Sequence, residues 1–368
     1  MLALRANEER GFTCAIGIGG IGAGIMFSLH GDHDLGRNES RLGELLDSRD
    51  YCKLHILEHY IARIMGSGKA PGGFRVFPIG VVGNDETGKR IMGEMSAAGL
   101  DMQFMRSDPS FKTLFSVCFI YPDGSGGNFT SSNSAAGSLN ADDLRSASRC
   151  MAAAGSRAVA ICVPEVPLEL RREFLELATH CGNYRACSFA LGDIEEARNM
   201  GLIALTDLLA LNQEEASALF GSGSGHLLNE ELLTEYAATY TATHPALRLV
   251  VSFGSKGAYG FEGGRMQYSP APVLQSRSTA GAGDALLAGV VCALAAGIPF
   301  IMPGDAGKTF EGRVLRTGLD FGVLISSFTV TSVHSIHPDT EMKNLLSFAE
   351  QQGASISESI RSACYESE

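Results

Sequence analysis

Short apolar runs alternate with segments of helical periodicity along most of this chain, and this alternation constrains the fold more than any other feature. The apolar runs, which predict strands, lie at residues 74–83, 157–163, 207–212 and 247–254. The helical segments lie at 85–100, 140–155, 168–182, 282–298 and 314–332, with a further helix beginning at 213 and an amphipathic one at 340–353. Strands and helices that alternate in this way form a mostly parallel sheet with helices on both faces, so we predict an α/β fold.

Two further stretches predict hairpins beside the main sheet. Residues 114–132 hold two strand-like runs joined by a Pro-Asp-Gly-Ser-Gly-Gly turn, and residues 257–269 form a second pair. We expect residues 1–368 to fold as one α/β domain. We expect a small β lid to be built from parts of about 20–45 and 110–132.

Composition and charge exclude several classes of protein. The formal net charge of −12 argues against nucleic-acid binding, which depends on Lys and Arg that neutralise phosphates. No run approaches the ~18 apolar residues of a membrane span, and the charged first residues do not form a signal peptide. The nine cysteines stand singly, without zinc spacing, which favours reduced cysteines in a cytoplasmic protein.

The glycines of "AIGIGGIGAGIMF" (15–27) have the Gly-x-Gly-x-x-Gly spacing of a dinucleotide-binding turn, in Gly17, Gly19 and Gly22. Such a turn opens a helix and is followed about 20 residues later by an acid that ends a second strand. Here the glycines continue into apolar residues and then a charged loop. We therefore predict the first strand of the sheet, with close backbone approach to a substrate, rather than an NAD site.

A second glycine cluster, "STAGAGDALLAG" (278–289), leads directly into a long apolar helix. The start of a helix offers free N–H groups and a positive dipole end to an anion. Gly281, Ala282 and Gly283 let the backbone approach a phosphate, and Asp284 in the first turn is placed to accept a proton from an attacking hydroxyl. The pattern therefore fits phosphoryl transfer. The alternative is a tightly packed helix start whose Asp284 serves only the helix dipole.

This segment resembles the signature of the PfkB (ribokinase-like) carbohydrate kinase family, Asp-Thr-x-Gly-Ala-Gly-Asp, which stands here as Ser278 to Asp284. Three more segments resemble family elements in the same order: 78–101, 207–219 and 249–261. The resemblance covers about residues 75 to 330. It implies a ribokinase-like fold and an ATP- and Mg²⁺-dependent kinase that phosphorylates a hydroxyl of a sugar or sugar-like substrate.

The resemblance also implies roles for individual residues. Asp284 would be the catalytic base, and the backbone of Gly281, Ala282 and Gly283 would form the anion hole. The positions implied to meet the nucleotide are Asn212, Glu215, Ser252, Gly254, Lys256, Gly257 and His334, with Glu215 also holding Mg²⁺ through water. An alternative for Asn212 and Glu215 is a helix cap and a first-turn acid, and for Lys256 a solvated side chain.

The amino-terminal half departs from the family pattern. Gly22 falls about where relatives carry an Asp that binds substrate hydroxyls, and segment 45–66 stands where they carry a Gly-Gly element. Carboxylates and amides suit hydroxyls, and a Lys suits a phosphate. The substrate-binding candidates are Gly22, Asp34, Asn38, Asp50, Lys53 and Glu165. Glu165 is expected at a strand end, whereas the other polar candidates have the alternative of a solvated loop.

Ser278 replaces the Asp that helps hold a monovalent cation in many relatives, which puts potassium activation in doubt. Three alternatives stay open beside the sugar kinase. They are a nucleoside kinase of the same fold, a non-catalytic sugar- or nucleotide-binding protein, and an NAD-dependent oxidoreductase that depends only on the amino-terminal glycines. The resemblance further implies a possible homodimer through the lid.

Overall fold

The central element is a nine-stranded sheet in a computed structural model that describes residues 2–7, 9, 11–69, 73–123, 126–221, 227–303 and 309–366. In spatial order its strands are β14 (Arg265–Pro270), β13 (Gly257–Glu262), β12 (Arg248–Ser252), β11 (Leu208–Asn212), β10 (Tyr184–Ser188), β9 (Ala158–Cys162), β2 (Cys14–Ile18), β5 (Arg75–Gly83) and β6 (Met105–Asp108). The strands from β12 to β6 run parallel, and β13 and β14 form the predicted antiparallel hairpin. The prediction of a mostly parallel α/β sheet is confirmed.

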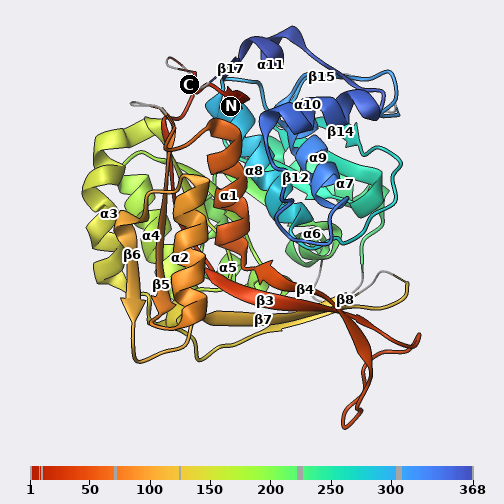
Figure 1. Ribbon diagram of the computed structural model, residues 1–368. Helices are drawn as coiled ribbons and strands as arrows, with labels where there is room; N and C mark the ends of the chain where they lie inside the picture. Colours follow the sequence, from red (N-terminus) through yellow and green to blue (C-terminus); the bar gives the residue numbers. More distant parts are fainter. Residues whose placement is uncertain are drawn as a thin grey trace.

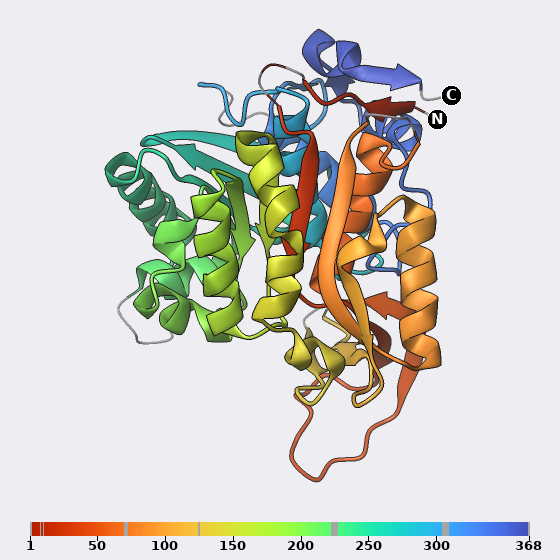
Figure 2. The ribbon, with the colours of Figure 1, turned by 90° about the vertical axis from the view of Figure 1, so that its left-hand side faces the viewer.

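Helices cover both faces of this sheet (Figure 1). One face carries α1 (Lys53–Met65), α2 (Glu86–Ala98), α8 (Ala282–Ala295), α9 (Gly318–Thr329) and α10 (Met342–Gln351). The other carries α3 (Ala141–Ala154), α4 (Leu168–His180), α5 (Ile194–Asn199), α6 (Gln213–Phe220) and α7 (Glu230–Thr243), and Figure 2 views the molecule from this side. Neighbouring strand residues point to opposite faces of the sheet. Ile161 therefore packs in the core between the sheet and the helices α1 and α8, and Cys162 packs in the core between the sheet and α3 and α4.

Capping residues set where the helices begin. Asn140 and Asp143 form a capping box at the start of α3, at the beginning of the segment 140–155 that is predicted to be helical. The prediction of one helix over 314–332 is wrong at its start. Thr317 and Asp320 form a capping box that begins α9 at Gly318, and the preceding residues form β15 (Val314–Leu315), which pairs with β16 (Ser355–Ile356).

A second, four-stranded sheet lies against the main body and is called the small sheet below. Its strands, in order, are β4 (Gly43–Tyr51), β3 (Gly22–Leu29), β7 (Leu114–Ile120) and β8 (Gly126–Thr130). Most of it comes from the segments predicted to form a lid, although β4 extends beyond residue 45. Figure 1 shows it below the helices, with the β3–β4 hairpin projecting from the body. In the predicted turn between β7 and β8, Gly124 and Ser125 lie outside the described residues.

The glycine-rich stretch at 15–27 is divided between the two sheets. Gly17 lies in β2, Gly19 in the turn that follows, and Gly22 begins β3. The stretch is thus strand, turn and strand, without the helix start that a dinucleotide site requires.

The two ends of the described chain meet as well. Strand β1 (Leu2–Leu4) pairs with β17 (Cys364–Glu366), which follows the short helix α11 (Glu358–Ser362). None of the helices within the described residues has both the length and the hydropathy needed to cross a membrane.

Candidate active site

A cavity of about 740 Å³ opens where the parallel strands end, between the main sheet and the small sheet. Its walls include Glu165 after β9, Ser188 at the end of β10, Asn212 at the end of β11 and Ser252 at the end of β12. Carboxyl ends of strands are where open α/β sheets bind ligands. A second cavity of about 390 Å³ adjoins the first and shares with it residues at the start of α8.

The first turn of α8 lies at the junction of these two cavities. Gly281 has φ 76°, and a Cβ there would collide with the backbone oxygen of Ser335, so only glycine fits. Gly283 has open space around its missing Cβ. The N–H groups of Gly283 and Asp284 donate no backbone hydrogen bond within the described part of the chain. Free N–H groups at the start of a helix are an anion site.

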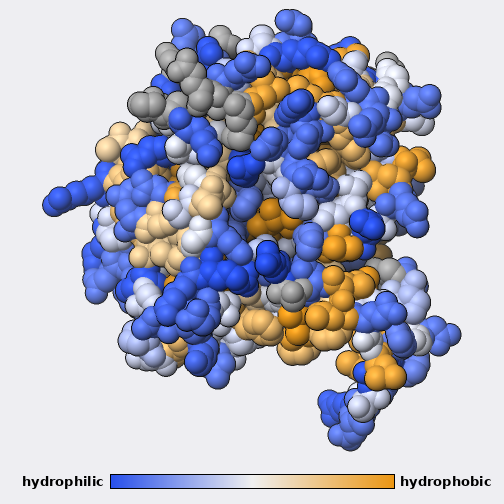
Figure 3. All heavy atoms as spheres, viewed as in Figure 1, coloured by the Kyte–Doolittle hydropathy of each residue, from blue (hydrophilic) through white to orange (hydrophobic). Residues whose placement is uncertain are grey.

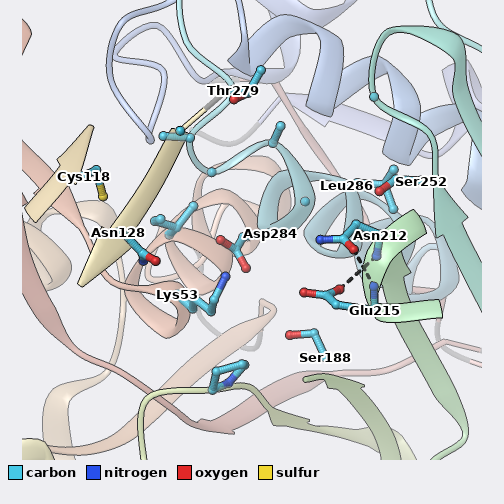
Figure 4. Close-up of a pocket in the computed structure, with 18 of the residues that line it drawn as sticks. Lys53, Cys118, Asn128, Ser188, Asn212, Glu215, Ser252, Thr279, Asp284 and Leu286 are labelled. Carbon is cyan, nitrogen blue, oxygen red and sulfur yellow. Dashed lines mark hydrogen bonds between the residues drawn. The ribbon is translucent and has the colours of Figure 1, made fainter. Parts of the chain in front are cut away.

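Asp284 projects from this turn into the larger cavity (Figure 4). Its side chain is 9% exposed, and burial raises the pKa of its carboxyl group. The Lys53 ammonium opposes that shift, whereas Asp50 adds to it. A carboxylate that remains ionised here can accept a proton from a hydroxyl bound beside the anion site.

Lys53 is the first residue of α1, and Figure 4 shows its side chain pointing toward Asp284, with Glu215 beyond. It makes no side-chain hydrogen bond among the described residues, and it is the only basic residue of the described chain that lines the larger cavity. The negative charge of Asp284 has the largest effect on the pKa of Lys53 and raises it. Burial lowers this pKa, whereas Glu165 and Glu215 raise it further. The ammonium is therefore charged and free to bind an anionic group.

Glu165 lies beside the start of α1. Its φ of 77° is left-handed, and its Oε2 accepts a 3.0 Å hydrogen bond from the backbone N–H of Lys53. Burial raises the pKa of its carboxyl group, and Lys53 opposes this rise. The expected position at a strand end is what the structure has, and the side chain lines the cavity.

Asn212 and Glu215 form a capping box at the start of α6 (Figure 4). Glu215 Oε2 accepts a 2.9 Å bond from the N–H of Asn212, and Asn212 Oδ1 accepts a 2.8 Å bond from the N–H of Glu215. The helix cap that the sequence offered as an alternative role for Asn212 and Glu215 is therefore present. Burial raises the pKa of Glu215 to about 6, with Asn212 and Lys53 opposing the shift. The carboxylate also lines the larger cavity, so the cap and a ligand role are compatible.

The small sheet supplies the opposite wall of the cavity. Asp50 of β4 is 3% exposed, and its Oδ2 accepts a 3.1 Å bond from the Sγ of Cys118 on β7. Ser116 and Asn128 line the same wall. Ser116, Cys118 and Asn128 are not among the residues predicted from the sequence. Their signal was the alternation of polar and apolar residues along β7 and β8, because alternate residues of a strand share a face.

Several predicted site residues lie elsewhere in this structure. Asp34 and Asn38 are exposed on the β3–β4 hairpin, and Gly22 packs against Cys52 and Leu114, where a Cβ would not fit. Lys256 is exposed and pairs with Glu230 at 2.6 Å. His334 pairs with Asp47 at 2.6 Å and does not line either of the two cavities.

The smaller cavity is lined mainly by apolar groups and hydroxyls. The lining residues come from the segment after β14 and from α9, and they include Ala271, Pro272, Val273, Leu274, Val323, Ser326, Ser327 and Val330. Ser252, Gly254 and Gly257 of the predicted nucleotide loop join them. Of the residues around the predicted nucleotide contact His334, Ser327 and Val330 line this cavity, whereas His334 itself bonds Asp47 of β4.

Solved structures of similar fold are ribokinase-like kinases. The ribokinase from Giardia lamblia superposes with a TM-score of 0.71 at 13% identity, covering 90% of this chain and 98% of the other. The ribokinase from Cryptococcus neoformans var. grubii serotype A in complex with ADP gives 0.68 at 18% identity, covering 91% and 98%. The adenosine kinase from Sinorhizobium meliloti gives 0.66 at 17% identity, covering 93% and 99%.

These likenesses establish the fold. The family follows from the sequence itself, because the model of the pfkB family carbohydrate kinases matches residues 68–342, about three quarters of the chain. The protein is a kinase of the PfkB carbohydrate kinase family, and the predicted resemblance is confirmed.

Proposed function

We propose that the protein transfers the γ-phosphoryl group of ATP to a hydroxyl of a sugar or sugar-like molecule. The observation that carries this proposal is the position of Asp284, buried beside the free N–H groups that begin α8, at the junction of two cavities. One cavity is polar and suits an acceptor, and the other is apolar and suits a nucleotide base.

In this proposal Asp284 accepts the proton of the attacking hydroxyl. The backbone of Gly281, Ala282 and Gly283, extended by the N–H of Asp284, stabilises the charge that develops on the transferred phosphoryl group. The unpaired N–H groups of Gly283 and Asp284 are the main donors, since the N–H of Ala282 already donates to the Thr279 carbonyl at 3.3 Å. Lys53 favours the ionised form of Asp284, since its positive charge lowers the pKa of that carboxyl group. The same ammonium is placed to contact the phosphoryl oxygens during transfer.

The nucleotide would occupy the smaller cavity, with Ser252, Gly254 and Gly257 close to its sugar and phosphates. Glu215 Oε1 makes no hydrogen bond among the described residues, so this oxygen fits a water of hydrated Mg²⁺. Bound Mg²⁺ would neutralise charge on the β- and γ-phosphates. We leave Lys256 and His334 out of the nucleotide site because both are paired elsewhere.

The acceptor would bind between α1 and the small sheet. Asp50 and Glu165 offer carboxylate oxygens, and Ser116 and Asn128 offer a hydroxyl and an amide. Such groups bond vicinal hydroxyls. Asp50 lies on β4, where it pairs with Gly24 of β3, and its side chain lines the cavity. It would therefore supply the carboxylate that Gly22 lacks.

The small sheet would act as a lid, and its outer face also supports the expected homodimer. Phe115, Phe129 and Leu45 are 41%, 63% and 56% exposed on it, respectively. Apolar side chains gather over this part of the molecule in Figure 3. Exposed aromatic residues on one sheet face are typical of an interface.

Release of ADP tests the kinase proposal. The purified protein is incubated with ATP, Mg²⁺ and a panel of sugars, sugar alcohols and nucleosides. We expect ADP release with a sugar or sugar alcohol. ADP release with nucleosides alone would favour the nucleoside kinase. A compound that raises the melting temperature without ADP release from any panel member would favour the non-catalytic binding protein.

A further inference from the structure

A third cavity, of about 400 Å³, is lined by a cluster of basic and imidazole side chains. It lies between the end of β4, one face of α1, the end of α2 and the segment 334–340. It shares only Tyr51 with the larger cavity of the candidate active site. We call it the imidazole cavity. Its polar lining residues are Arg49, Tyr51, His55, His59, Arg63, Glu94, His334, His337 and Thr340.

Helix α1 contributes a continuous polar stripe to the imidazole cavity. His55, His59 and Arg63 stand four residues apart, a spacing that places them on one face of the helix. The ring of His55 contacts Tyr51 at a centroid distance of 4.4 Å and His59 at 5.8 Å. The stripe therefore faces β4 and segment 334–340 rather than the sheet core.

Three of the acidic side chains around this cavity already have partners. Glu94 accepts hydrogen bonds from Arg90 at 3.1 Å and from the hydroxyl of Tyr51 at 2.9 Å. Glu341 pairs with Arg63 at 2.7 Å. Asp47 pairs with His334 at 2.6 Å, whereas the exposed Asp339 contributes only its backbone N–H, which donates a hydrogen bond to His337 Nδ1. The carboxylates of Glu94, Glu341 and Asp47 are thus occupied, and no group of three metal-ligating side chains occurs within the described chain.

The donors are the groups that lack partners. His55 is fully buried, and neither ring nitrogen makes a hydrogen bond. The Nδ1 of His59 also has none. The guanidinium of Arg49 is exposed and makes no hydrogen bond or ion pair among the described residues. Burying these nitrogens without partners is unfavourable. The half-buried ring of His59 and the exposed guanidinium of Arg49 are the groups that a ligand in the cavity can reach directly.

We propose that the imidazole cavity binds the phosphate group of a small phosphate ester. Unpartnered guanidinium and imidazole groups recognise an oxyanion, since each can donate N–H bonds to its oxygens. Burial lowers the pKa of both His55 and His59, to about 4 for His59, so each ring is neutral near pH 7 and has one N–H. The volume lies in the range of sites for small organic ligands and leaves room for more than a free phosphate ion.

A ligand in the imidazole cavity would also affect acceptor binding. This effect rests on the proposed kinase function, whereas the binding of the phosphate ester does not. Arg49 and Tyr51 flank Asp50, which faces the acceptor cavity. A ligand held by Arg49 would brace β4 and so fix the position of the Asp50 carboxylate. The imidazole cavity would then couple a phosphate ester to acceptor binding.

Calorimetric titration tests the binding. Glycerol 3-phosphate is titrated into the protein in the presence of Mg²⁺ and a saturating non-hydrolysable ATP analogue, which keeps the anion site of α8 occupied. We expect glycerol 3-phosphate to bind, and Arg49→Ala and His59→Phe each to weaken binding at least about tenfold. Arg149→Ala is the matched control, since Arg149 is exposed on α3, and we expect binding within about twofold of the unchanged protein.

Two outcomes of the titration with glycerol 3-phosphate would overturn the proposal. They are the absence of binding at millimolar glycerol 3-phosphate, and equal binding by the unchanged protein and Arg49→Ala, whose exposed side chain can be removed without disturbing the core. Inorganic phosphate should bind more weakly than the ester, and equal affinity would contradict an ester site. If the ATP analogue does not bind, the proposed kinase function fails, and the titration without it still compares Arg49→Ala with Arg149→Ala.

Discussion

At the scale of single residues, two glycines in the first turn of α8 have different reasons to be glycine. Gly281 needs its left-handed φ and lies against backbone of Ser335, whereas Gly283 has open space where a Cβ would be. The first glycine is therefore required by the fold. The second is compatible with alanine in the fold, and its missing side chain leaves room for a phosphate in the cavities it lines.

The two alanine variants should separate these roles. We expect Gly281→Ala to lower the free energy of unfolding by about 1–3 kcal/mol, because it adds strain and a backbone collision. We expect Gly283→Ala to keep its melting temperature within a few degrees and to lose at least about tenfold in kcat for ADP formation. Thermal melts and steady-state kinetics measure both. A Gly283→Ala enzyme of normal rate would show that no phosphate approaches this turn closely.

Lys53 offers a test through pH. Its charge lowers the pKa of the buried Asp284, so Lys53→Met should raise that pKa. Because the base acts when ionised, the acidic limb of the pH profile of kcat should move to higher pH in Lys53→Met and stay near its place in Lys53→Arg. The backbone bond to Glu165 survives both changes. A limb that does not move would separate Lys53 from the ionisation of Asp284.

At the scale of elements, helices α3 and α6 begin with the same device, a capping box, in different places. Asn140 and Asp143 cap α3 far from the cavities, whereas Asn212 and Glu215 cap α6 at the cavity edge. Substitutions at Asn140 and Asn212 can therefore separate the contribution of a cap to the stability of the protein from a role in ligand binding.

Asn140→Ala and Asn212→Ala should each cost about 1 kcal/mol of unfolding free energy, the usual effect of a lost cap. Only Asn212→Ala should also raise the KM for ATP, because it releases the Glu215 carboxylate that would face Mg²⁺. Chemical denaturation and ATP titration measure the two effects. If both variants leave the KM unchanged, the capping box is structural alone.

At the scale of the whole molecule, the small sheet has one face toward the cavity and one toward solvent. The cavity face carries Ser116 and Cys118, and the outer face carries Phe115 and Phe129. This division is what a lid that also joins two copies would need.

Sedimentation tests the dimer. We expect the unchanged protein to sediment as a dimer and Phe129→Glu to sediment as a monomer, because the new charge would be buried in the interface. Leu232→Glu, on the exposed face of α7, is the matched control and should remain dimeric. A monomer at every concentration of the unchanged protein would contradict the proposal.

Much of this architecture could be predicted from the sequence, because strand–helix alternation and helix caps are local signals. The helices α2 and α3 begin within one residue of the starts of the predicted segments 85–100 and 140–155, after the caps Asp85 and Asn140. The start of α9 was missed because apolar residues stand on both sides of Thr317, so the helical spacing of apolar residues continues across the cap. The wall of the acceptor cavity was predicted only in part, since the pairing of β4 with β3 brings Asp50 inward and leaves Asp34 and Asn38 on the hairpin. Such strand pairing is a long-range contact that no local pattern encodes.

The central claim is that Asp284 is the base of a phosphoryl transfer, and its most direct test is the rate of a single turnover. Asp284→Asn removes the proton acceptor and keeps the size of the side chain, so the fold and the binding of ATP and acceptor should persist. We predict that the rate of ADP formation falls by at least ~10²-fold while the binding affinity for the nucleotide stays within a few-fold. A single-turnover rate equal to that of the unchanged protein would contradict the claim.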